Sequence, residues 1–377
     1  MKLMFLTLLA VTAVCAGGAR ATPGLQVGIA DSGSAYFETA GSFFPDLTEL
    51  HAQVLRAQLH WGGPLGAARS RPANPVDPTD PAYDWARYDD VVVAAQKAGV
   101  QVVFTIFGTP TWANGGQSVT HAPSNASDLE KFAYAAAKRY DGTFTRADGV
   151  VLPRVDEWTA WNEPNLPLGL VPQWRRVGGR WVIQSARDYA RICNAVVAGV
   201  HGTLSPGERV ACGDTAPRGN NAPTSSRPTT SPLAFLRAMK QAGATGFDAY
   251  AHHPYPSGPS ESPTMRPKVS TALTFGNLGD LSTQLTKLYG SSMPIWLDEY
   301  GYQTNPPDKG LGVSPAKQAR YLTQSVALAR KNPRVTMLLW FLVRDEPNLS
   351  GWQSGLETKT GAHKPAFAAF VKAASGS

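Results

Sequence analysis

Two glutamates each stand at the end of an apolar, strand-like run, and such a pair can do acid–base chemistry. Glu163 lies in WTAWNEPN, between an amide side chain and a proline, and Glu299 lies in PIWLDEYGYQ. A carboxylate among bulky apolar groups is paired, exposed to solvent or kept for chemistry. If the two converge, one can protonate a leaving oxygen while the other attacks or activates water, as cleavage of a glycosidic bond requires.

Eight apolar runs must position these side chains, and segments of helical periodicity separate the runs. This α/β alternation is typical of a parallel sheet. Several runs are almost continuously apolar, as expected for strands that are buried on both faces. The expected strands are Leu25–Ala30, Val54–His60, Gln101–Phe107, Val155–Asn162, Arg209–Gly213, Phe247–His253, Pro294–Tyr300 and Val335–Val343.

The pattern predicts a single (β/α)8 TIM barrel over residues 22–377, with long βα loops. Only the stretch 31–53 is poorly patterned. The longest loops each follow a strand and precede a helix, on the face where this fold carries active sites. They are 62–82, 166–184, 216–231 and 256–276, and the second of them contains WRRVGGRWVI, which predicts a hairpin.

The motifs at the ends of strands four and seven resemble a known group of enzymes. WNEPN (161–165) and DEYG (298–301) look like clan A glycoside hydrolases, the retaining (β/α)8 enzymes, most like family 39 or the cellulase-like family 5. The resemblance covers most of the chain after residue 25. It implies that Glu163 is the general acid/base, that Glu299 is the nucleophile, and that Asn162 hydrogen-bonds the sugar 2-hydroxyl.

The resemblance also implies a set of substrate-binding residues around the two glutamates. Arg56 would keep the nucleophile ionised, and Tyr255 would donate a hydrogen bond to Glu299. Trp340 would form an apolar floor under the sugar ring, and Trp112 would lie near the mouth. His253 completes the set because it stands two residues before Tyr255.

Three of these positions carry a competing interpretation. Arg56 could form a structural salt bridge with no catalytic part. His252 could take the place of His253, because only one of two adjacent strand residues faces the pocket. Asp298 stands where the group commonly has Thr or Ser, and strand alternation is expected to turn its side chain away from that of Glu299.

The N-terminus predicts a secretory signal peptide over residues 1–21, and hence a secreted, extracellular protein. Lys2 precedes the apolar stretch Leu3–Val14, and Ala19-Arg20-Ala21 is a small-residue cleavage signal. Cys15 raises the alternative of a lipoprotein, although Val14 fits poorly before a lipidated cysteine. The apolar stretch is too short to span a bilayer, and no later segment is apolar enough to do so.

Composition narrows the choice of partners. The formal charge is +7, and removal of Lys2 and Arg20 leaves +5, with no Lys/Arg run that would favour nucleic acid. No spacing of His or Cys predicts a metal site, and the expected chemistry needs no cofactor. We expect a monomer acting on a carbohydrate. Cys193 and Cys212 could form a disulfide or remain buried thiols.

The sequence therefore predicts a secreted retaining glycoside hydrolase. The alternatives are a non-catalytic glycan-binding barrel, or a transglycosylase that uses the same residues. In the hairpin, Trp174 and Trp181 could stack on sugar rings, and Arg175, Arg176 and Arg180 could meet an acidic glycan. Packing within the hairpin and solvated charge are the favoured explanation of the same residues.

Overall fold

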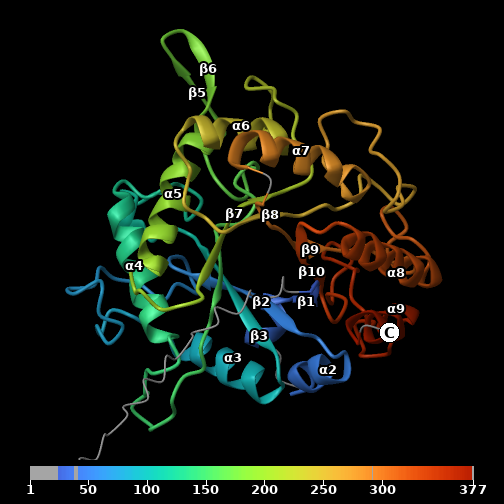
Figure 1. Ribbon diagram of the computed structural model, residues 1–377, viewed down its shortest axis with the longest axis horizontal. Helices are drawn as coiled ribbons and strands as arrows, with labels where there is room; N and C mark the ends of the chain where they lie inside the picture. Colours follow the sequence, from blue (N-terminus) through green and yellow to red (C-terminus); the bar gives the residue numbers. More distant parts are fainter. Residues whose placement is uncertain (1–23, 38–40, 291, 376–377) are drawn as a thin grey trace, which may run out of the picture.

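A computed structural model of the chain describes residues 24–37, 41–290 and 292–375. The predicted signal peptide and Cys15 lie outside the described residues. Within them, eight parallel strands close into a barrel in the order β1-β10-β9-β8-β7-β4-β3-β2, and helices surround it (Figure 1). The predicted (β/α)8 fold is confirmed. The barrel strands are β1 (Gln26–Ala30), β2 (Val54–His60), β3 (Gln101–Phe107), β4 (Glu157–Ala160), β7 (Arg209–Thr215), β8 (Ala249–His252), β9 (Ile295–Tyr300) and β10 (Val335–Phe341).

The helices lie between the strands, in the segments where the sequence showed helical periodicity. Three of them begin on a proline, α6, α8 and α9, which suits the first helical position because its N–H would have no partner there. The poorly patterned stretch after β1 contains two short helices. The helices are α1 (Ser32–Phe37), α2 (Phe43–Glu49), α3 (Ala86–Lys97), α4 (Ala126–Arg139), α5 (Gln184–His201), α6 (Pro232–Gln241), α7 (Leu278–Tyr289), α8 (Pro315–Lys331) and α9 (Pro365–Ala374), with 3-10 turns at Thr111–Ala113 and Phe275–Asn277.

Two apolar cores hold the barrel together. The larger fills the space between strands and helices, and the smaller fills the inside of the barrel. Alternate strand residues supply the inner core, so the barrel is packed rather than open. The inner core consists of Ala30, Val54, Val103, Ala211, Ala249, Ala251, Trp296, Met337 and Leu339. Among the described residues, no helix has the length and apolar character needed to span a membrane.

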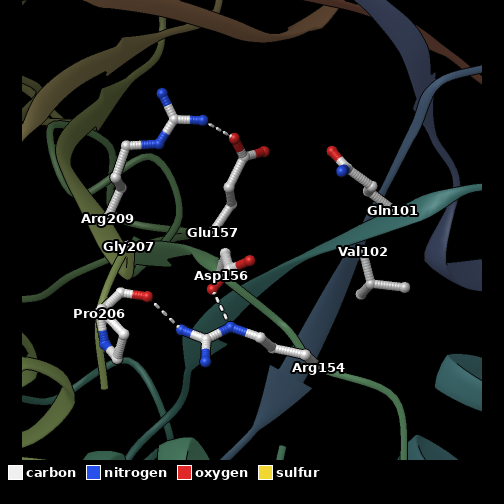
Figure 2. Close-up of a pocket in the computed structure, with 8 residues that line it drawn as sticks. All are labelled: Gln101, Val102, Arg154, Asp156, Glu157, Pro206, Gly207 and Arg209. Carbon is white, nitrogen blue, oxygen red and sulfur yellow. Dashed lines mark hydrogen bonds and ion pairs between the residues drawn. The ribbon is translucent and has the colours of Figure 1, made fainter. Parts of the chain in front are cut away.

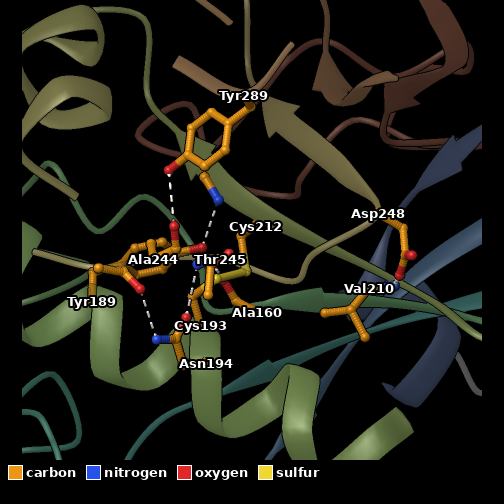
Figure 3. Close-up of a disulfide and its surroundings, with 12 residues drawn as sticks. Ala160, Tyr189, Cys193, Asn194, Val210, Cys212, Ala244, Thr245, Asp248 and Tyr289 are labelled. Atoms are coloured by element: carbon orange, nitrogen blue, oxygen red, sulfur yellow. Dashed lines mark hydrogen bonds between the residues drawn. A yellow bond between two sulfur atoms is a disulfide. The ribbon is translucent and has the colours of Figure 1, made fainter. Parts of the chain in front are cut away.

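A disulfide joins α5 to β7. Cys193 and Cys212 are bonded, which resolves the alternative that the sequence left open (Figure 3). At the next residue of α5, the side chain of Asn194 donates to the carbonyl of Gly243 and accepts from the backbone N–H of Thr245, at 3.0 Å each. The covalent bond and these hydrogen bonds fix α5 against the strands that follow it.

The amino ends of the strands enclose a polar pocket at the base of the barrel. Figure 2 shows two ion pairs there, Glu157 with Arg209 and Arg154 with Asp156. Burial is the main reason that the pKa of Glu157 is raised, despite the contact with Arg209. The charges of this pocket neutralise one another, and in this fold the base serves stability rather than chemistry.

Candidate active site

The two predicted catalytic carboxylates meet at the mouth of the barrel. Glu163 follows β4 and Glu299 lies in β9, and one oxygen of each lies within 4.8 Å of the other and of His253 Nδ1. The two carboxyl side chains are 22% and 13% exposed, respectively, so both can be reached from solvent. Carboxylates this close fit the separation of retaining enzymes, about 5–5.5 Å, and not the 6.5–9.5 Å of inverting ones.

The backbone that carries Glu163 is held in an unusual conformation. β4 ends at Ala160, earlier than predicted, because Trp161 and Glu163 have positive φ angles of 71° and 43°. Each such residue costs about 1–3 kcal/mol and persists only where its surroundings enforce it. Here Trp161 Nε1 donates to the carbonyl of Gly169, and the N–H of Glu163 donates to the carbonyl of Asp214, both at 2.8 Å.

Gly169 is required by this arrangement. A Cβ at this position would lie 2.2 Å from the carbonyl oxygen of Glu163 and 2.3 Å from that of Asn162. The loop therefore returns directly against the backbone of the motif, and only glycine permits the approach.

A β-bulge in β9 places both Asp298 and Glu299 toward the barrel axis. Leu297 pairs with Leu338 and Tyr300 with Trp340, so β9 has one residue more than β10 over this interval. Such a bulge breaks the alternation of side chains and re-aims them. The expectation that Asp298 turns away from Glu299 is therefore wrong, because both carboxylates contact Arg56.

A second register shift, in β7, brings in a carboxylate that sequence reasoning missed. Between Cys212 and Thr215, β7 again has one residue more than its neighbour β8. Gly213 has φ 108°, and a Cβ there would lie 2.5 Å from the ring of Tyr250. The extra residue is Asp214, which is fully buried and points at Arg56 and His253. The available signal was an acid at the carboxyl end of a predicted strand, one residue beyond the predicted boundary.

Arg56 is the centre of the buried charge network. Its Nη2 lies 2.8 Å from Asn162 Oδ1 and 2.9 Å from an oxygen of Asp214. Nη1 lies 2.8 Å from Glu299, and Nε lies 3.1 Å from Asp298. Burial alone would lower the pKa of Arg56, but the three carboxylates outweigh it and raise the pKa. Arg56, from β2, thus joins four side chains that come from β7, from β9 and from the end of β4.

His253 links the two glutamate-bearing sides of the site. Its Nδ1 lies 3.1 Å from Glu163 and 4.0 Å from Glu299, and its Nε2 lies 2.8 Å from Asp214. Burial opposes the charged form, but the carboxylates dominate and raise the pKa of His253 well above its ordinary value. The imidazolium therefore donates from both nitrogens. The ring of His253 is fully buried, so it contacts the glutamates but not solvent.

His252 is the other member of the pair and has a different environment. It is fully buried on the outer side of β8, between Thr215 Oγ1 and the carbonyl of Leu273, each at 2.9 Å. Burial lowers the pKa of His252 to about 3, so it stays neutral. Of the two histidines, His253 is thus the one that contacts the glutamates, and its predicted part in binding substrate stays a prediction.

Asp214 and Asp298 behave as a coupled pair. Burial and the adjacent charge of Asp214 raise the pKa of Asp298 well above its ordinary value. Burial also opposes ionisation of Asp214, but Arg56 and His253 outweigh it and lower the pKa of Asp214. Two close buried carboxyls cannot both ionise readily, so Asp298 holds the proton and Asp214 the charge.

Tyr255 and Asn162 each form a hydrogen bond to a charged residue of the site, Tyr255 to Glu299 and Asn162 to Arg56. The hydroxyl of Tyr255 donates to Glu299 at 2.9 Å. Because Arg56 occupies the amide oxygen of Asn162, the amide nitrogen of Asn162 remains as the donor for a ligand. The hydrogen bond that the resemblance assigns to this amide stays a prediction.

The aromatic residues differ from the prediction. Trp340 is only 3% exposed, packs against Tyr300 and donates from Nε1 to the carbonyl of Ser354, so it belongs to the outer core. Trp340 was predicted to lie at the mouth from its strand position alone, because the conformation of the loop after β10 could not be predicted from the sequence. Trp352, in that loop, lies 5.2 Å from the ring of Tyr255 and is 39% exposed. Phe341 packs against both Tyr255 and Trp352.

Trp112 lies in the 3-10 turn after β3, near Trp61. Its Nε1 donates to the carbonyl of Ala68 at 2.9 Å, and Arg71 stacks over its ring at 4.5 Å. One ring face is therefore covered within the protein. Its predicted contact with substrate stays a prediction.

Two groups of side chains offer atoms that could hold a cation. They are Glu163 with His253 and Glu299, and Asp214 with His253 and Asp298. Arg56 already lies 2.8–3.1 Å from the carboxyl groups of Asp214, Asp298 and Glu299, and His253 is charged. A metal ion would therefore have to displace existing positive charge. The prediction of a metal-free and cofactor-free site stays a prediction.

Comparisons with solved structures support this architecture. A family 39 glycoside hydrolase from Bacteroides cellulosilyticus WH2 matches with TM-score 0.65 and 18% identity, covering 94% of this chain and 64% of that chain. A glucosidase from Croceicoccus marinus matches with TM-score 0.66 and 15% identity, covering 94% and 68%. A GH5_18 protein from Bifidobacterium longum subsp. infantis matches with TM-score 0.59 and 14% identity, covering 94% and 79%.

These likenesses are likenesses of fold. The chain has the (β/α)8 barrel of glycoside hydrolase families 39 and 5, as the motifs indicated. It spans somewhat less than two thirds of the family 39 structure. At the level of sequence, no family model and no curated protein matches the chain.

Proposed function

We propose that this protein is a retaining glycoside hydrolase that cleaves a poly- or oligosaccharide by double displacement. The observation that carries the proposal is the approach of Glu163 and Glu299 to within 4.8 Å at the carboxyl ends of the barrel strands. This separation suits a nucleophile and a general acid on either side of one glycosidic bond. The fold shared with known glycoside hydrolases supports the same reaction class.

In the first step, an oxygen of Glu299 attacks the anomeric carbon while the glycosidic bond breaks. Glu163 gives its proton to the departing oxygen, so the leaving group departs as an alcohol. Arg56 and Tyr255 hold the attacking carboxylate by hydrogen bonds of 2.8 and 2.9 Å, which fix its position. Asn162 donates a hydrogen bond from its amide nitrogen to the sugar.

In the second step, Glu163 takes a proton from water, and the water oxygen bonds to the anomeric carbon. The bond to Glu299 breaks, and the sugar leaves with its original configuration. His253 holds Glu163 throughout from its Nδ1, and Asp214 holds His253 from the other side. His253 and Asp214 are positioning residues in this scheme. A protein secreted by the predicted signal peptide would meet such a polysaccharide outside the cell.

The test is a comparison of Glu163→Gln, Glu299→Gln and native protein on a panel of aryl glycosides and plant and bacterial polysaccharides. Glu299→Gln is expected to abolish turnover, because no covalent intermediate can form. Glu163→Gln is expected to lose about 10²–10⁴-fold on polysaccharides. Its loss should be smaller on aryl glycosides, whose leaving groups need no proton.

Glu49→Gln is the matched control, because Glu49 is an exposed glutamate at the end of α2. NMR of the first product should show retained configuration. Inversion would contradict the role of Glu299. Binding without turnover in the native protein would establish a glycan-binding barrel instead, and transfer to an added sugar acceptor in preference to water would establish a transglycosylase.

A further inference from the structure

Two stretches of the loops that follow β4 and β7 carry positive charge only. Residues 166–183 and 216–231 together contain five arginines, with no lysine, aspartate or glutamate. We call these residues the arginine rim: Arg175, Arg176, Arg180, Arg218 and Arg227. All five are exposed. Charges of one sign along a mouth raise the local concentration of ligands of the other sign.

Three of the five arginines stand on a hairpin. β5 (Trp174–Val177) and β6 (Arg180–Ile183) pair antiparallel and project beyond the helices (Figure 1). The turn is Gly178-Gly179, both with positive φ, as a tight hairpin turn requires. Arg175 and Arg180 share one face, while Arg176 stacks beside Trp181 on the other, 5.8 Å from its ring. Trp181 is 42% exposed.

The hairpin and the loop after β7 form one surface with the active site. Trp174 Nε1 donates to the carbonyl of Thr229 at 3.3 Å, which ties the hairpin base to that loop. Asn165, two residues after Glu163, donates to the carbonyls of Ala216 and Thr230 and accepts from the N–H of Ala216. A polysaccharide that passes from the catalytic pair across this side of the mouth must therefore meet the rim.

The rim has no internal counter-charge. Within residues 24–37, 41–290 and 292–375, none of its five arginines forms an ion pair with a carboxylate. Arg176 and Arg218 form hydrogen bonds only to backbone carbonyls, of Gly179 and Ser257. Some other arginines of the described surface are paired, such as Arg266 with Asp280 at 2.7 Å. The rim is thus a set of exposed cations that a ligand can neutralise.

We propose that the arginine rim binds the carboxylates of a uronate-containing polysaccharide, which makes an acidic glycan the substrate class; the second part rests on the proposed function. Arginine without lysine favours carboxylate, because the guanidinium fork binds it through two parallel hydrogen bonds. An exposed tryptophan beside a guanidinium suits a uronate, which offers an apolar ring face and a carboxylate together. The rim is continuous with the surface around Glu163, the proposed acid/base residue of a glycoside hydrolase. A glycan is therefore favoured over nucleic acid as the ligand.

The experiment measures binding separately from turnover, in the Glu299→Gln background of the full chain. Affinity electrophoresis and calorimetry are run with polygalacturonate and alginate, with neutral galactan and xylan, and with heparin and single-stranded DNA. The rim variant is Arg175→Gln/Arg176→Gln/Arg180→Gln. The control variant is Arg237→Gln/Lys287→Gln/Arg320→Gln, which removes the same charge from exposed positions on α6, α7 and α8.

We expect binding to polygalacturonate or alginate that weakens with salt, since exposed charges are screened. The rim variant should lose about tenfold in affinity, because three exposed and individually weak ion pairs are removed together, and the control should lose less than twofold. Equal binding of neutral glycans, equal affinity of rim and control variants, or no binding to either polyuronate would overturn the proposal. Tighter binding of heparin or DNA than of the two polyuronates would overturn the proposal that the rim binds carboxylates. Binding of polyuronate without hydrolysis by the native protein would uphold the rim and reject the glycosidase.

Discussion

Arg56 and Glu299 are joined by a hydrogen bond of 2.8 Å although 243 residues separate them in the chain. Arg56 comes from β2 and Glu299 from β9, so the contact depends on closure of the whole barrel. The same guanidinium reaches Asn162, Asp214 and Asp298. Assembly of the site therefore depends on folding of the barrel, and we propose that Arg56 serves both stability and function.

Arg56→Met should therefore destabilise the protein as well as inactivate it. It would leave buried carboxylates without their cation, which costs about 3–5 kcal/mol. Urea unfolding would measure the loss. Arg56→Lys keeps the charge but cannot reach several carboxylates at once, so it should recover stability more than activity. Equal recovery of stability and kcat by lysine would contradict a role for the fork geometry.

Gly169→Ala should impair catalysis from a distance. The added Cβ must push the backbone of Asn162 and Glu163, and a displacement of about 1 Å can cost about 10²-fold in rate. Steady-state kinetics on an aryl glycoside would measure the effect as a fall in kcat. Gly279→Ala is the matched control, because a Cβ in α7 at that position meets nothing within 4 Å. It should leave kcat unchanged and slightly stabilise the helix. Full activity of Gly169→Ala would show that the motif tolerates movement.

Acid should destabilise the protein through two neutral histidines, the half-buried His60 and the fully buried His252. Burial lowers the pKa of His60 to about 4 and that of His252 to about 3. The pKa values of both histidines are lower in the folded protein than in the unfolded chain. Between about pH 6.5 and pH 4 the unfolded chain therefore binds more protons than the folded protein. The free energy of unfolding consequently falls as the pH drops through this range. Unfolding curves across this range should show a shallower slope for His60→Gln, by up to one proton or about 1.4 kcal/mol per pH unit. Parallel curves would refute the assignment.

Loss of the disulfide should lower stability by about 3 kcal/mol. Cys193 and Cys212 are 19 residues apart, and closing a loop of this length restricts the unfolded chain by about that amount. The measurement is urea unfolding of Cys193→Ala/Cys212→Ala against native protein, with native protein in reductant as a second comparison. Identical midpoints for oxidised native protein and the double variant would contradict the bond.

The sequence could predict the barrel and the two glutamates for a clear reason. Strands buried on both faces must be apolar, so β2 and β3 are found to the residue. Parallel strands end on one face, so Glu163 and Glu299 had to lie at the same mouth once the strand order was a closed ring.

The remainder depended on one-residue irregularities that carry no local signal. The bulges at Asp214 and at Asp298-Glu299 change which side chains face the axis, although both stretches resemble regular strands in the sequence. Trp340 lies in the expected strand, but its side chain packs on the outer face of the barrel. Trp352, from the following loop, lies beside Tyr255 at the mouth instead. Loop conformation decides such exchanges, and it follows from tertiary contacts rather than from the residues themselves.

Asn165 gives the mouth a property that matters to anyone who re-engineers it. Its side chain satisfies backbone groups of the loop after β7 from its place in the loop after β4. The two loops are therefore a single transplantable part. A graft of either loop alone onto another barrel would leave buried polar groups without hydrogen-bond partners, whereas a graft of both would carry the rim and Glu163, the proposed acid/base residue, as one module.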